Sequence, residues 1–150
     1  MSLLFHGPKG SAEHRWIDYA LLRDNVQHHL EGGSPAGAFT HLHAVADALG
    51  GRVVSLPAAE IHAELDRARA LLTRPVSELA ISTRTHAVVS YAWPPPAEQR
   101  TRLVKDESTP LPSLTGRETT LADVFGSLLD DLMRITDGAA AGQQLTVTDH

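Results

Sequence analysis

The chain has 150 residues, with 13 lysines and arginines against 18 aspartates and glutamates, so its formal net charge is −5. It contains no cysteine, which excludes disulfides, thiolate metal sites and cysteine nucleophiles. The length fits a single domain over 1–150, and the lack of an apolar run of about 18 residues predicts a soluble, cytoplasmic protein with no membrane partner.

The first 50 residues predict one strand and two helices. Residues 2–6 are expected as a short strand, which a glycine- and proline-rich turn separates from the first helix. That helix is expected over 11–31, where apolar residues recur at helical spacing before a pair of glycines. A second helix is expected over 34–49, because Ser34 can cap it, Pro35 suits its first position and its apolar stripe is unbroken.

Two further helices and a closing strand are expected in the rest of the chain. An extended connector over 52–55 leads into a third helix over 57–74, which begins at a proline and ends before another. A fourth helix is expected over 120–136, because a threonine stands three residues before an aspartate, the spacing of a capping box. A short strand over 144–148 follows it.

Between residues 77 and 93 the apolar residues alternate with polar ones, which predicts a strand. Residues 99–105 are expected to return antiparallel to it after a bend of three prolines. The predicted fold class is therefore α+β, with four amphipathic helices packed on a small antiparallel sheet built around this hairpin.

The start of this segment also shows a family resemblance. About ten residues resemble the opening of the C-terminal domain of the bacterial RNA polymerase α subunit, through Pro75, Val76, Leu79, Ile81, Ser82 and Arg84. The resemblance implies a helix over 82–93 and a contact between Arg84 and DNA. Ala87 and Ser90 stand where that family usually carries asparagine and lysine, and the alternating pattern keeps the strand as our prediction.

Four side chains have the spacing of a metal site. His43 and Asp47, like His62 and Asp66, are four residues apart, so each pair shares one face of a helix. Imidazole and carboxylate groups are ligands that zinc accepts. A metal-dependent enzyme that holds a divalent ion with these residues is therefore one hypothesis, although the same spacing is common in surface ion pairs. No other cofactor is expected.

The leading hypothesis is a non-enzymatic protein-binding module, such as a small regulatory, inhibitor or assembly and adaptor protein. No nucleophile elbow, phosphate loop or pair of convergent carboxylates is present. Trp16, Tyr91 and Trp93 are the interface candidates, because tryptophan and tyrosine are enriched in protein interfaces. The partner is expected to be another protein, and a homo-oligomer is compatible with the sequence.

A third hypothesis is association with nucleic acid through the basic residues of the predicted hairpin, Arg84, Arg100, Arg102 and Lys105. These residues would have to share one face. The acidic net charge disfavours this class, because it repels a phosphate backbone.

Overall fold

The computed structural model describes residues 2–31, 37–48, 51–76, 78–82, 88–92 and 118–149. The described elements, in chain order, are β1 (Ser2–Gly7), β2 (Gly10–Arg15), α1 (Trp16–Leu30), α2 (Thr40–Ala44), the 3₁₀ helix η1 (Val45–Ala48), β3 (Val53–Pro57), α3 (Ala58–Leu72), β4 (Glu78–Ser82), β5 (Val88–Ala92), α5 (Leu121–Val124), α6 (Gly126–Thr136) and β6 (Gln144–Asp149). The predicted mixture of helix and antiparallel sheet is confirmed. Among these helices, none has the length and apolar character that spanning a membrane requires.

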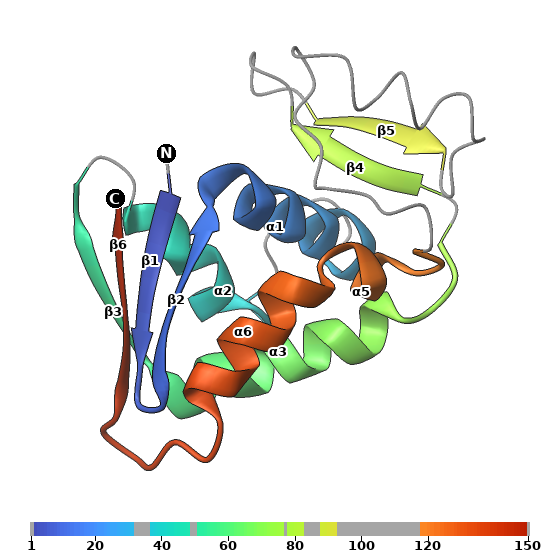
Figure 1. Ribbon diagram of the computed structural model, residues 1–150. Helices are drawn as coiled ribbons and strands as arrows, with labels where there is room; N and C mark the ends of the chain where they lie inside the picture. The colour runs from blue at the N-terminus through green and yellow to red at the C-terminus, as the bar shows by residue number, and fades with distance from the viewer. Residues whose placement is uncertain are drawn as a thin grey trace.

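Four strands form the larger sheet, in the order β2-β1-β6-β3, and every neighbouring pair is antiparallel. The last strand of the chain, β6, lies between β1 and β3 (Figure 1). The strand predicted at the C-terminal end is therefore confirmed, and it holds a central place in the sheet. Strands β2 and β3 are the two edges.

The described helices pack on one face of this sheet (Figure 1). Alternate residues of the three strands β1, β6 and β3 point to that face, and they include the buried Phe5, Val147 and Leu56. They join one apolar cluster with α1, α3 and α6, in which Tyr19 packs against Phe5 with ring centroids 5.9 Å apart. The opposite face of the sheet carries the partly buried and exposed residues of the same strands.

The first predicted helix begins later than expected. Residues 10–15 form β2, which pairs with β1 from Gly7↔Gly10 to Ser2↔Arg15, and α1 starts only at Trp16. The predicted turn does reverse the chain, and six residues with weak strand propensity are held extended by backbone bonds to β1. The prediction of a helix over 11–15 is therefore wrong, because pairing with a neighbouring strand overrides local preference.

The second predicted helix is much shorter in the part of it that the structure describes. A five-residue helix, α2, is followed by the four residues of η1. The carboxylate of Glu64 on α3 accepts the backbone N–H groups of His41 and Leu42, which a longer helix would use internally. The start of α2 is thus capped by another helix.

The third and fourth predicted helices are confirmed, with a break in the fourth. α3 begins directly after Pro57, and Thr120 with Asp123 forms the predicted capping box at the start of α5. Phe125 separates α5 from α6 and has non-helical backbone angles. The apolar stripe continues across this break, so both helices face the core.

A hairpin lies in the region where one was predicted, but both of its strands come from residues 78–92. β4 and β5 pair antiparallel, with Leu79 opposite Tyr91, as a separate two-stranded sheet. The single strand predicted over 77–93 is therefore wrong, and so is the helix over 82–93 that the family resemblance implies. The expected return strand over 99–105 lies outside the described residues.

Candidate functional site

At alternate residues of β3, the backbone N–H and C=O groups point away from β6, the neighbouring strand. Ala58 donates its N–H to the carbonyl of Gln143 at 2.9 Å, which fixes the phase of the bonds between β3 and β6. In an antiparallel pair, residues that bond to the neighbouring strand alternate with residues that do not, so residues 54 and 56 bond to β6 as Ala58 does. Val53, Ser55 and Pro57 therefore direct their backbone groups outward. Pro57 fits this position because it has no N–H to leave unpaired.

The side chains of β3 give this edge no electrostatic protection. The strand has no charged residue from Val53 to Pro57. Among the large hydrophobic residues that the structure describes, Val53 is the one with a largely exposed side chain, at 67%. Ser55 is exposed as well. An uncharged edge strand with open N–H and C=O groups is a template for pairing with another extended chain.

The open face of the sheet beside this edge is also poor in charge. Leu4, Thr148 and Val53 lie side by side across β1, β6 and β3, and Thr146 lies next to Ser55. These residues are partly buried or exposed, and no described helix covers them (Figure 1). Depletion of charge in the centre of a surface is typical of protein interfaces.

A second notable cluster joins His41 of α2 to two glutamates of α3, the buried Glu64 and the exposed Glu60. The Nδ1 atom of His41 contacts the carboxylate of Glu64, whose side chain is 8% exposed, and Nε2 lies 3.2 Å from the carboxylate of Glu60. Glu64 also accepts the backbone bonds that begin α2. Close by, the buried hydroxyl of Tyr19 donates to the carbonyl of Leu42, and burial raises the pKa of this tyrosine. The cluster fastens α2 to α1 and α3.

The four residues of the predicted metal site are not brought together. Nε2 of His43 contacts Glu31 at the end of α1, and Nδ1 of His62 lies 2.9 Å from the hydroxyl of Thr136. Asp47 and Asp66 are exposed. Across the described residues, no group of three or more histidine, aspartate or glutamate side chains is arranged to hold a metal ion.

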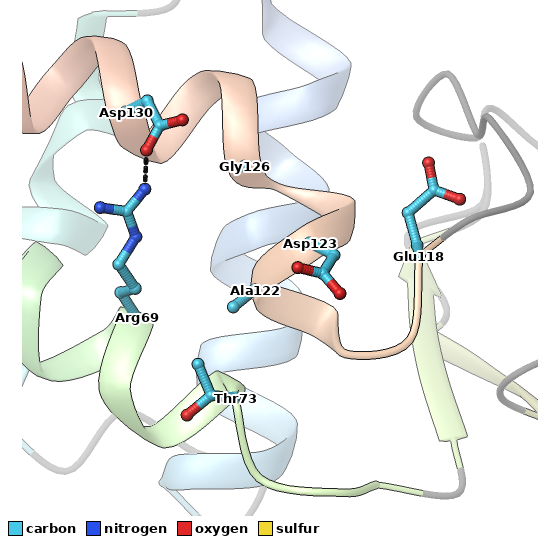
Figure 2. Close-up of a pocket in the computed structure, with 7 residues that line it drawn as sticks. All are labelled: Arg69, Thr73, Glu118, Ala122, Asp123, Gly126 and Asp130. Carbon is cyan, nitrogen blue, oxygen red and sulfur yellow. Dashed lines mark hydrogen bonds and ion pairs between the residues drawn. The ribbon is translucent and has the colours of Figure 1, made fainter.

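A cavity of about 570 Å³ lies between α3, α5 and α6 and is lined by Arg69, Thr73, Glu118, Ala122, Asp123, Gly126 and Asp130. Figure 2 shows the guanidinium of Arg69 paired with the carboxylate of Asp130 across it. Asp123 is engaged by the N–H groups of Thr119 and Thr120, which lower the pKa of its carboxyl group. These contacts within the fold give structural roles to Arg69, Asp123 and Asp130.

The interface and nucleic-acid candidates have different outcomes. Trp16 is partly buried against the core, with the guanidinium of Arg23 over its ring at 5.4 Å, so it packs within the structure. Tyr91 lies in β5, and its side chain is outside the described part of the structure. The remaining candidates, Trp93, Arg84, Arg100, Arg102 and Lys105, all fall outside the described residues.

The sequence pattern did not predict the β3 edge, although a signal for it was present. It predicted an extended connector over 52–55, and a valine pair followed by Pro57 is typical of an edge strand. Comparison with known proteins adds no candidate: no family model matches the chain, and no significant match was found among curated proteins or solved structures. The candidate site is therefore the edge of β3, whose outward backbone groups have no partner among the residues that the structure describes, together with the open face beside it.

Proposed function

We propose that this chain is a non-enzymatic protein-binding module that adds an extended segment of its partner to the free edge of β3. The observation that carries the proposal is the combination, on one strand, of outward N–H and C=O groups at Val53 and Ser55 with an absence of charge. Pairing at a sheet edge provides affinity through backbone bonds, and side chains on the adjoining face provide selectivity. An assembly or regulatory role follows more directly from such an edge than an enzymatic one.

The two edges of the sheet provide a matched test. Ser55 on β3 and Ser11 on β2 both direct their N–H groups outward, and both are exposed. Proline at either position removes one donor that the sheet does not use. Ser55→Pro should therefore weaken binding at β3 at least about tenfold, whereas Ser11→Pro should leave it unchanged.

The experiment compares capture of proteins from the native host by the wild-type chain and by the two variants, with quantitative mass spectrometry. We expect a partner that binds the wild type and Ser11→Pro equally and is depleted at least about tenfold with Ser55→Pro, as loss of edge bonds at the contact requires. Partners retained equally by Ser55→Pro would contradict the proposal. Circular dichroism of both variants is the control, and it should show the same helix and strand content as the wild type.

A further inference from the structure

The chemistry of the β3 edge specifies the strand that would pair with it. We propose that this strand is β3 of a second copy of the chain, so that two four-stranded sheets join across a two-fold axis. The inference rests on the proposed function, whose partner it names. The partner strand must be extended, must have N–H groups at the bonding positions and must not bring negative charge to an acidic protein. β3 itself meets all three requirements.

One antiparallel register satisfies every open group at the centre of this edge. If the two-fold axis passes beside Val54, then Val53 of one copy lies opposite Ser55 of the other. Both residues direct N–H and C=O outward, so the two copies form four backbone bonds and leave none of these eight groups unpaired. Pro57, which has no donor, falls beyond this central ladder. The two Val54 side chains meet at the axis.

The charges along this edge permit contact between copies. Each copy carries a formal charge of −5, which opposes association in general. No acidic residue occurs from Gly51 to Ala59, so the edges approach without carboxylates facing each other. The two Arg52 residues flank the ladder about 13 Å apart, four strand positions, which exceeds the screening length of about 8 Å at physiological salt.

The expected complex is a reversible dimer. A pair of five-residue strands covers less than the roughly 800 Å² per partner that stable complexes bury. Association should therefore depend on concentration and should strengthen with added salt, because salt screens the repulsion between two acidic molecules.

Sedimentation velocity of the full chain over a concentration series, from about 10 µM to about 1 mM, tests the inference. We expect the wild type and Ser11→Pro to shift from monomer to dimer over this range, and Ser55→Pro to lower the association constant at least about tenfold. Val53→Glu keeps the N–H but places carboxylates about 7 Å apart across the axis, and it should weaken the dimer as well.

Two results would overturn the inference: a wild-type chain that remains monomeric throughout, or a Ser55→Pro chain that dimerises like the wild type. The capture experiment separates this failure from that of the proposed function. A different protein captured in a Ser55-dependent manner, by a chain that stays monomeric, would refute the second copy and support the edge. A monomeric chain with no Ser55-dependent partner would refute both.

Discussion

The two edges of the four-stranded sheet have the same backbone geometry but different side chains. On β2 the outward positions are Ser11, Glu13 and Arg15, and the two charged residues are exposed. On β3 the outward positions are Val53, Ser55 and Pro57, and none is charged. Charged residues at an edge discourage pairing with other chains, so the comparison indicates that β2 is protected and β3 is available.

A third edge shows another way of blocking pairing. The side-chain amide of Asn25 on α1 donates to the carbonyl of Ala80 and accepts its N–H, both at 2.9 Å. The carbonyl of Glu78 accepts a bond from Nε2 of His29 at 2.9 Å. The outer edge of β4 is therefore occupied by side chains of a helix. Of these three edges, β3 alone has neither charge nor a described partner on its outward groups.

The largest change in stability is expected from Gly7→Ala, at the end of β1 where the β1–β2 turn packs against α6. A Cβ atom at this position would collide with the backbone carbonyl of Ile135 on α6. That carbonyl accepts the N–H of Lys9 at 3.1 Å, so it cannot move away freely. We expect a loss of about 2–3 kcal/mol in the free energy of unfolding, measured by urea denaturation.

Gly126→Ala is the control for this substitution, because the added carbon meets no described atom within 4 Å beyond its chain neighbours and the backbone of its own helix. It should be neutral or stabilising by up to about 1 kcal/mol, since alanine favours a helix. Equal losses in the two variants would show that contact between the β1–β2 turn and α6 does not anchor this side of the sheet.

Asn25→Ala is expected to release the blocked edge of β4. Asn25 is fully buried and its amide also donates to the carbonyl of Leu21, so truncation leaves the N–H of Ala80 unpaired. The expected loss is about 2 kcal/mol. Hydrogen exchange should accelerate at Ala80 more than at Val147 in the centre of the larger sheet. Uniform acceleration at both amides would contradict a local role for Asn25.

A smaller effect is expected from Asp131→Asn, which weakens the attachment of β2 to α6. Nε2 of His14 lies 2.8 Å from the carboxylate of Asp131, whose side chain is 37% exposed. Because solvent screens this pair, we expect a loss of about 0.5–1 kcal/mol in thermal or chemical denaturation. A loss above about 2 kcal/mol would show that this contact, rather than apolar packing, holds β2 in place.

The smallest effect concerns pH. Burial, followed by the neighbouring His28, lowers the pKa of His29, so protonation of this ring is less favourable in the folded chain than in the unfolded one. Its contribution to stability is therefore complete above about pH 6.5 and is lost as the pH falls below it. His29 is partly exposed, so the effect amounts to a few tenths of a kcal/mol. In denaturation series from pH 7.5 to about 5, His29→Gln should show a shallower decline than the wild type, and equal slopes would exclude His29 as the cause.

The sequence predicts the elements that apolar periodicity and local caps determine. α3 and α6 follow their stripes, and the capping box at Thr120 forms as expected. The sequence does not predict β2 or the short length of α2, because both depend on contacts with other elements of the fold. Backbone bonds to β1 hold β2 extended, and Glu64, about 20 residues away on another helix, caps α2.

The candidate site could not be predicted from the sequence for the same reason. Residues 52–55 are correctly expected to be extended, but their place at a sheet edge depends on β6, some 90 residues later in the chain. The predicted metal pairs have correct helical spacing, yet their histidines contact Glu31 and Thr136, which pattern analysis does not place near them. The spacing of residues within one helix does not show which side chains of a neighbouring helix will contact them.

The most direct measurement of the central claim is a series of amide NMR spectra recorded as the chain is concentrated. Association through β3 predicts shifts centred on the amides of Val53 and Ser55, with smaller shifts at Thr146 and Thr148 on the open face and none at Ser11 or Glu13. Shifts centred on β2 or on the cavity beside Arg69, or spectra that do not change with concentration, would contradict association through β3.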